Sequence, residues 1–148
     1  ILALTRQNLP TIRHAGDSNL SARGAYILAG EAANPIRLIA SGSEVQLALG
    51  ARDILAKDGL QAAVVSMPSW ELFAHQSDSY RNEVMGGGGT VRVACEAASG
   101  FGWERWLGAK GAFVGMAGFG ASAKAADLYK HFGITAEAIA SAARRLAQ

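Results

Sequence analysis

The segment from Ile36 to Ser69 constrains the fold of this chain more than any other stretch. It opens with a short apolar run that ends at Ser41-Gly42-Ser43, and it closes with the β-branched pair Val64-Val65 before Pro68. Between the two runs, apolar residues fall on one helical stripe, namely Leu47, Ala48, Ala51, Ile54 and Leu55. The pattern predicts a strand, a helix and a second strand. Two strands that are joined by a covering helix should lie parallel, with a right-handed crossover.

The ends of this helix are marked by residue types that begin and stop helices. Ser43 is predicted to be the N-cap, and Glu44 suits the positive end of the helix dipole. Lys57 in the last turn and Gly59 just beyond it supply the stop signal. We therefore expect the helix to lie between Ser43 and Gly59.

Composition limits the classes of protein to which the chain can belong. Its 148 residues are most simply one domain, and 18 glycines against 3 prolines are typical of an α/β protein with tight strand-to-helix turns. A net charge of +2 with scattered lysines and arginines argues against nucleic-acid binding. The single cysteine, Cys95, excludes an internal disulfide framework and a cysteine-rich metal site.

The sequence predicts neither a membrane span nor a signal peptide. No stretch reaches about 18 uninterrupted apolar residues, and no charged region precedes an apolar core at the start. The cytoplasm is the natural compartment for such a chain. Because the chain starts at Ile1 rather than Met, inside an apolar run, we expect it to be a fragment of a longer chain.

The remaining segments extend the alternation of strands and helices. Residues 1–5 read as a strand, 10–24 as a polar linker, and 25–30 as a brief strand that runs antiparallel to the next, because Asn34-Pro35 is so short a connection. Further strands are expected at 90–94 and 112–116. Helices are expected after Ser69, at residues 77–85, around Trp103 and Trp106, from Ser122 to Gly133, and from Thr135. Ser69, Ser122 and Thr135 are the predicted N-caps of their helices.

This order predicts an α/β fold, a three-layer α/β/α sandwich with a mostly parallel five-stranded sheet and one antiparallel strand. In such sheets, ligands sit beyond the carboxyl ends of the strands. The loops at this edge are therefore the candidate sites, namely residues 41–44, 67–70, 95–102 and 116–122.

One of these loops resembles a dinucleotide fingerprint. Gly118-Phe-Gly120-Ala-Ser-Ala123 has the required letters, follows a strand and opens a helix. The fingerprint also needs a further parallel strand with an acidic residue to take the ribose. Here the next segment is Gly133-Ile134-Thr135, followed by the last helix. We therefore interpret the motif as a tight turn built from glycines.

Other candidate residues have an ordinary structural interpretation that is preferred. Ser41-Gly42-Ser43 could hold a phosphate with free backbone N–H groups, but helix capping explains it as well. Glu96 could act as a general acid or base, yet no carboxylate or histidine lies at a spacing that fixes a partner. Cys95 is more typical of a small apolar filler than of a nucleophile.

The histidines and tryptophans also give no site. His14, His75 and His131 lack the i, i+4 spacing of a helical metal pair, so we expect surface or packing roles. The tryptophans could stack on a ligand, but at the starts of elements over a sheet they are more typical of core or subunit contacts; they are Trp70, Trp103 and Trp106.

Arg6 is the candidate with the most specific chemistry. It follows the first predicted strand, is flanked by Gln7 and Asn8, and carries a planar donor fork that suits phosphate. On physical grounds alone, a solvated loop arginine is the preferred interpretation.

Several stretches, taken together and in this order, resemble the C-terminal part of a transketolase. They are residues 4–10 (Leu-Thr-Arg-Gln-Asn-Leu-Pro), 40–45 (Ala-Ser-Gly-Ser-Glu-Val), 64–69 (Val-Val-Ser-Met-Pro-Ser), 111–116 (Gly-Ala-Phe-Val-Gly-Met), 119–123 (Phe-Gly-Ala-Ser-Ala) and 132–135 (Phe-Gly-Ile-Thr). The resemblance covers nearly the whole chain.

The resemblance implies an enzyme that moves a two-carbon ketol unit from a ketose phosphate to an aldose phosphate. Such enzymes are homodimers that use thiamine diphosphate and a divalent metal, Mg or Ca. Residues 1–13 would be the tail of the pyrimidine-binding domain, 14–24 a linker, and 25–148 the C-terminal domain, which helps to form the dimer. Tryptophans would be available for that dimer contact.

The resemblance also implies which residues take part in binding. The family's arginine in Ser/Thr-Arg-Gln contacts the substrate phosphate, and Arg6 matches it. The glutamate that activates the cofactor, the cofactor contacts and the metal ligands all belong to other parts of such enzymes. The isolated fragment should therefore be structural, without activity of its own and without a bound cofactor.

Two alternatives remain open. The same type of domain ends related thiamine enzymes, including deoxyxylulose-phosphate synthases and the β-subunits of oxo-acid dehydrogenases. A free-standing α/β module that binds a nucleotide or another effector would belong to a different class. Motifs for thiamine diphosphate ahead of Ile1 in the reading frame would favour an enzyme, and a start codon just before it would favour the module.

Overall fold

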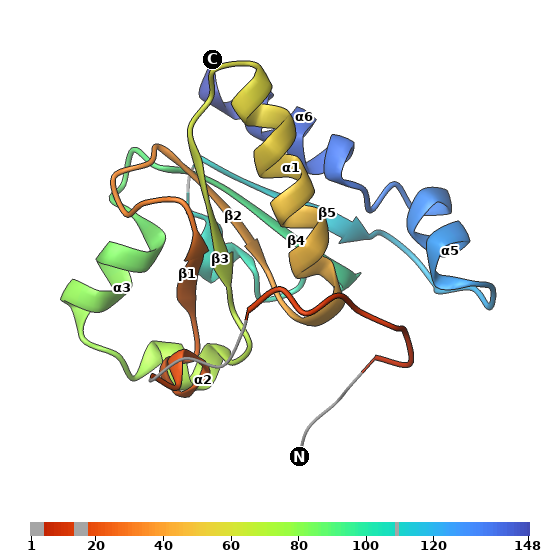
Figure 1. The fold of residues 1–148 in the computed structure, drawn as a ribbon, viewed down its shortest axis with the longest axis horizontal. Helices are drawn as coiled ribbons and strands as arrows, with labels where there is room; N and C mark the ends of the chain where they lie inside the picture. Colours follow the sequence, from red (N-terminus) through yellow and green to blue (C-terminus); the bar gives the residue numbers. More distant parts are fainter. Residues whose placement is uncertain (1–4, 14–17, 109) are drawn as a thin grey trace.

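Five strands form one twisted sheet in the order β1-β3-β2-β4-β5 (Figure 1). The computed structural model describes residues 5–13, 18–108 and 110–148. The strand predicted at residues 1–5 therefore lies outside the described residues except for Thr5, and His14 lies wholly outside them. The strands are β1 (Tyr26–Ala29), β2 (Ile36–Ala40), β3 (Ala62–Ser66), β4 (Val91–Ser99) and β5 (Gly111–Met116).

Strand directions confirm the predicted sheet. β2, β3, β4 and β5 pair as parallel neighbours, and β1 pairs with β3 in the antiparallel direction. The direction of β1 is the predicted one, but β3 lies between β1 and β2, so the two consecutive strands are not neighbours. The crossover through α1 carries β3 to this position.

The helices cover both faces of the sheet, as the three-layer prediction requires. They are α1 (Val45–Lys57), α2 (Trp70–Ala74), α3 (Asp78–Met85), α4 (Glu104–Leu107), α5 (Ala125–His131) and α6 (Ala136–Ala147), with 3-10 turns η1 (Leu20–Arg23) and η2 (Gly42–Glu44). α1 and α6 pack on one face, and α2, α3 and α4 pack on the other. Among the described residues, no helix is both long and apolar enough to cross a membrane.

Alternate residues of the central strands are buried in two separate cores, one on each face of the sheet. Leu38 and Val64 are buried in the core beneath α1 and α6. Their neighbours Ile39 and Val65 are buried in the opposite core, together with Phe73 of α2. Because parallel strands are normally covered on both sides, this double burial explains why the strand sequences read as continuous apolar runs.

The predicted helix caps Ser69 and Thr135 are confirmed, and Ser77 also caps a helix. The hydroxyl oxygens of Ser69, Ser77 and Thr135 each accept a hydrogen bond from a backbone N–H three residues further on, at 3.2 Å. Gly133 takes a φ of +67°, which glycine adopts easily, and it ends α5 as predicted.

Two other predicted caps are wrong. Ser43 lies inside η2, where its hydroxyl donates to the Glu44 carboxylate at 2.7 Å instead of capping α1. Ser122 lies three residues ahead of α5, which begins at Ala125 with Lys124 in the capping position and no side-chain cap. In both cases a short extra segment separates the strand from its helix.

The end of the predicted linker is part of the packed domain. Leu20–Arg23 forms η1, and the buried Gly24 that follows has a φ of +80°. A Cβ at Gly24 would stand 2.2 Å from the backbone nitrogen of Phe73, so only glycine fits against α2 at this point.

Two arginines fix the end of α3 against the sheet. Arg37, which is fully buried, donates to the backbone oxygens of Val84 (2.7 Å) and Glu83 (3.4 Å). Arg92, its register partner on β4, donates to the oxygen of Met85 at 2.9 Å. Each guanidinium also reaches further carbonyls, those of Ala32 and Asn34 from Arg37 and those of Gly86, Gly87 and Trp106 from Arg92.

These contacts satisfy the carbonyl groups that a helix leaves unpaired at its C-terminus. Positive charge is also favourable there, because the helix dipole has its negative end at this point. Burial lowers the pKa of both arginines, and the charge of Arg92 lowers the pKa of Arg37 further. Both groups stay protonated, since arginine does not lose its proton in proteins.

We expect Arg37→Met to lower the free energy of unfolding by about 3 kcal/mol or more, because several buried carbonyls would lose their donor at about 1–3 kcal/mol each. The control is Arg145→Met, which removes the same charge from an exposed position on α6 and should change stability by less than about 0.5 kcal/mol. Urea unfolding measures both. Equal, small effects of the two substitutions would contradict this role of Arg37.

Candidate functional site

The carboxyl ends of β2 and β4 bring polar side chains together at one edge of the sheet. Ser41 follows β2, and Glu96 lies on β4, one residue after Cys95, which is in register with the last residue of β2. The Ser41 hydroxyl donates to one oxygen of Glu96 at 3.3 Å, and the indole N–H of Trp103 donates to the other at 2.8 Å. Because both carboxylate oxygens already accept a bond, Glu96 acts here as an anchor for the loop that contains Trp103.

A second carboxylate network lies beside the first and joins distant parts of the chain. Glu44, which is only 5% exposed, accepts hydrogen bonds from Ser43 and from the hydroxyl of Tyr129 on α5. The side-chain amide of Gln7 donates to the same Tyr129 oxygen at 3.3 Å and to the hydroxyl of Thr5 at 3.0 Å. The segment at residues 5–13 is thus tied to the start of α1 and to α5.

Tyr129 is the titratable group of this network whose pKa is altered. Burial raises the pKa of its hydroxyl above 10.0, and the bond to the Glu44 carboxylate raises the pKa further. The neutral hydroxyl is therefore the form that fits the folded state.

A cavity of about 230 Å³ opens between α5 and the ends of β4 and β5. Its wall is mainly apolar and includes Ala97, Met116, Leu128 and Phe132, while Gln7 and Tyr129 supply polar atoms. Figure 1 shows α5 beyond the end of β5, which places the cavity at the carboxyl edge of the sheet. Such a cavity suits a side chain or an apolar ligand better than a charged group.

Arg6 lies next to Gln7 in the segment that this network holds, and its side chain is exposed. Gln7 anchors the backbone directly after Arg6, since its side chain bonds to both Thr5 and Tyr129. The guanidinium is therefore presented to solvent from an anchored position near the carboxyl edge.

Cys95 behaves as the predicted apolar filler. Its side chain is fully buried in the core beneath α1 and α6. Burial raises the pKa of the thiol to about 12, and the charges of Glu44 and Glu96 also raise it. Because the thiolate is the reactive form, Cys95 is not suited to nucleophilic chemistry at neutral pH.

The other candidate residues take structural positions. Trp103 and Trp106 are buried in the core on the α3 face, and Trp70 packs edge-on against Trp103, with ring centroids 5.0 Å apart. His75 is exposed and contacts the backbone oxygen of Glu71, and His131 packs against the ring of Phe132. The tryptophans are therefore core residues.

The glycine motif at residues 118–123 forms an exposed loop, not the predicted tight turn. Eight residues separate the end of β5 at Met116 from the start of α5 at Ala125. A Cβ at Gly118 or at Gly120 would meet nothing within 4 Å, so the local structure does not require glycine at either position. Phe119 between them is fully exposed.

The described residues show no cluster of side chains of the kind that holds a metal ion. Residues 5–13, 18–108 and 110–148 contain no group of three histidine, cysteine, aspartate or glutamate side chains that could hold a metal ion. The two carboxylates at this edge bind neutral donors of their own chain. What the edge offers is an anchored arginine and an apolar cavity.

Sequence patterns did not reveal the roles of Glu44, Gln7 and Tyr129. Glu44 was assigned to the helix dipole, but it is buried and bonded to a tyrosine 85 residues away. Tyr129 falls on one helical stripe with the apolar residues Ala125, Leu128 and Phe132, and nothing in that spacing indicates a partner for its hydroxyl. The only available signal was that Glu44 lies in the loop at residues 41–44, one of the candidate loops at the carboxyl edge of the sheet.

Known proteins resemble this chain in sequence over nearly its full length. The family model described as "Transketolase-like TK C-terminal domain" matches residues 24–135. The transketolase of Cereibacter sphaeroides is 54% identical over 145 residues, which are 97% of this chain and 22% of that protein. The chain thus spans less than a quarter of the length of this relative.

Solved structures resemble the chain in fold. A transketolase from Leishmania mexicana matches with a TM-score of 0.79 and 45% identity, covering 86% of this chain and 18% of that one. A transketolase from Pichia stipitis in complex with sedoheptulose 7-phosphate matches with a TM-score of 0.78 and 34% identity, again covering 86% and 18%. The sheet with one antiparallel edge strand is common to this chain and these structures.

We expect Tyr129→Phe to lower the free energy of unfolding by about 1–2 kcal/mol near neutral pH, because it removes a hydrogen bond to a carboxylate. Since the folded-state pKa of Tyr129 is raised, the hydroxyl stabilises the fold fully below pH 10 and loses that effect as the pH rises through the raised value. The stability difference between the original chain and Tyr129→Phe should therefore shrink at about pH 11.

Tyr80→Phe is the matched control, because the Tyr80 hydroxyl donates to a neutral backbone oxygen, that of Ala25, at 2.9 Å. Its loss should be about 1 kcal/mol. Urea unfolding at both pH values measures each variant. A Tyr129→Phe difference that stays the same from neutral to alkaline pH would argue against the contact with Glu44.

Proposed function

The chain belongs to the transketolase family, and we propose that it works as the C-terminal part of an enzyme that transfers a two-carbon ketol unit from a ketose phosphate to an aldose phosphate. The observation that carries this proposal is the 54% identity to a transketolase across 97% of the chain. The sugar phosphate in a solved relative that is 34% identical supports phosphorylated substrates.

In this proposal the chain supplies structure and one substrate contact, and the rest of the enzyme supplies the cofactor chemistry. Residues 1–13 would end the pyrimidine-binding domain, 14–24 would link, and 25–148 would form the C-terminal domain. Thiamine diphosphate and its divalent metal, Mg or Ca, would bind elsewhere, in the parts of the relatives that the 22% coverage leaves unmatched. When bound, that cofactor supplies the carbanion chemistry of ketol transfer.

Arg6 is proposed to bind the phosphate of the sugar substrate. A guanidinium fork matches phosphate oxygens with two parallel charge-assisted bonds. The neighbouring Gln7 is anchored to Tyr129, which supports a fixed position for the backbone at Arg6. Anchoring reduces the entropy that a flexible loop would lose when the substrate binds.

The carboxyl edge is also proposed to take part in a homodimer. Phe101 and Phe119 are 89% and 100% exposed, and they follow the neighbouring strands β4 and β5 at the same edge. Exposed aromatic side chains of this size are typical of interaction surfaces. The tryptophans, which were expected to serve this contact, are instead taken up by the core.

We expect Arg6→Ala in the complete enzyme to raise the KM for phosphorylated sugars roughly 10- to 100-fold, because one charge-assisted bond contributes about 1.5–3 kcal/mol. Turnover at saturation should change less, since the phosphate is remote from the bond that breaks. Steady-state kinetics with a phosphorylated acceptor and with glycolaldehyde measure the effect, and glycolaldehyde should hardly respond.

The control for Arg6→Ala is Arg13→Ala, which removes the same charge from the same segment. Arg13 lies over the ring of Tyr26, with its guanidinium carbon 5.4 Å from the ring centroid. Its substitution should leave the KM for phosphorylated sugars unchanged. Equal losses with both acceptors in Arg6→Ala would show that Arg6 supports the fold or the active-site frame, and the phosphate role would fail.

We expect the 148-residue chain alone to unfold in one cooperative transition, because both cores close within the described residues. We also expect it to have no ketol-transfer activity, because in this proposal the cofactor binds to other parts of the enzyme. Thermal unfolding followed by circular dichroism tests the first point. Isothermal calorimetry with thiamine diphosphate and magnesium tests the second, and micromolar binding to this chain would overturn the proposed division of labour.

A further inference from the structure

A polar pocket of about 290 Å³ lies on the α3 face of the sheet, away from the cavity beside α5. α3, α4 and β4 contribute most of its wall. Its polar lining residues are Asp78, Arg81, Asn82, Arg92, Arg105 and Trp106. Three arginines against one aspartate give this wall a net charge of +2. A concave surface with an excess of positive charge favours a ligand of the opposite sign.

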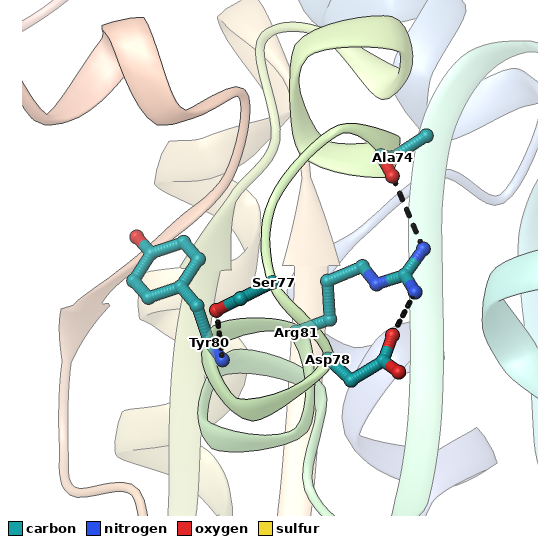
Figure 2. A network of polar contacts seen from close by, with 5 residues as sticks. All are labelled: Ala74, Ser77, Asp78, Tyr80 and Arg81. Carbon is teal, nitrogen blue, oxygen red and sulfur yellow. Dashed lines mark hydrogen bonds and ion pairs between the residues drawn. The ribbon is translucent and has the colours of Figure 1, made fainter.

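Two of the three arginines are held in place by the protein. Arg81 donates to the backbone oxygen of Ala74 at 3.1 Å and pairs with Asp78, and Figure 2 shows its guanidinium between these two groups. Arg92 is fixed by carbonyls at the end of α3, including that of Gly86 at 2.7 Å. Their positions are therefore set before any ligand arrives, which lowers the entropic cost of binding.

The third arginine lies over the aromatic wall of the pocket. The guanidinium carbon of Arg105 is 4.9 Å from the centroid of the Trp106 ring. Its side chain is exposed and lines the pocket. Glu71, outside the wall, also interacts with the charge of Arg105.

Trp106 supplies an independent sign of a missing acceptor. Its side chain is 8% exposed, and its indole nitrogen is a buried polar atom with no hydrogen-bond partner in the part of the chain that the structure describes. Buried donors are nearly always paired in folded proteins. Because Trp106 lines the pocket, an acceptor oxygen that reached this N–H from the pocket would pair it.

We propose that this pocket binds the phosphate group of a small molecule, at a site separate from Arg6. Phosphate has about two negative charges near neutral pH and three acceptor oxygens, which match a wall of net charge +2 with guanidinium, indole and amide donors. A carboxylate has one charge and two oxygens, so it would balance less of the positive charge of this wall.

The test is titration of the ¹⁵N-labelled 148-residue chain with inorganic phosphate and with glycerol 2-phosphate, followed by the indole N–H signals. The Trp106 signal should shift and saturate, because its N–H gains an acceptor. The Trp103 signal should stay, since that N–H already donates to Glu96 at 2.8 Å. Tighter saturation by glycerol 2-phosphate would identify a phosphate ester as the ligand, and equal saturation would identify free phosphate.

Matched variants separate this site from general charge. Arg105→Ala changes an exposed side chain and should weaken binding roughly 10- to 100-fold. Trp106→Phe keeps a ring in the core, removes the N–H, and should weaken binding about threefold to tenfold. Arg145→Ala, on the opposite face, should have no effect.

Three results would overturn the proposal. One is a Trp106 shift that grows linearly without saturation. Another is an equal shift with chloride at the same ionic strength. The third is an equal loss of binding in Arg145→Ala and Arg105→Ala.

Discussion

The pairing of two arginines with the end of a helix holds one face of this domain together. Arg37 and Arg92 are register partners on β2 and β4, so their charges are forced close to each other. The repulsion is offset because the last carbonyls of α3 and the negative end of its dipole face both guanidinium groups. The position of α3, the burial of Val84 and the wall of the polar pocket all depend on these contacts.

The fold was predictable from sequence, but this arginine pair was not. Central strands such as Ile36–Ala40 are buried on both faces, so their apolar runs and the helix between them fix the parallel sheet. Arg37 interrupts the first of these runs at its second position, and Arg92 does the same in β4. In a strand an isolated charge usually marks a solvated face. Burial of Arg37 is favourable because backbone carbonyls accept from it, including that of Val84 on α3, 47 residues away in the sequence. Arg92 is half-buried, and its partner carbonyls lie on α3, in the glycine loop after it and at Trp106.

Local signals failed where distant partners compete for the same side chain. Thr135 caps its helix as its sequence suggests, and its hydroxyl accepts from the backbone N–H of Ala138. Ser43 and Glu44 also have the sequence of a helix start. Here, however, Glu44 accepts a hydrogen bond from Tyr129, and the Ser43 hydroxyl donates to Glu44 instead of capping α1. The candidate site was predictable as an edge of the sheet and through Arg6, while the residues that anchor it could not be found without the fold.

The two carboxylates at the carboxyl edge of the sheet are bonded to neutral donors of the chain. At the carboxyl edge, Glu96 accepts bonds from Ser41 and Trp103, and Glu44 accepts bonds from two hydroxyl groups. Neutral donors therefore meet the hydrogen-bonding needs of both carboxylates. Among the described residues neither carboxylate forms an ion pair with Arg6, which agrees with the proposal that its guanidinium binds an anion from outside the chain.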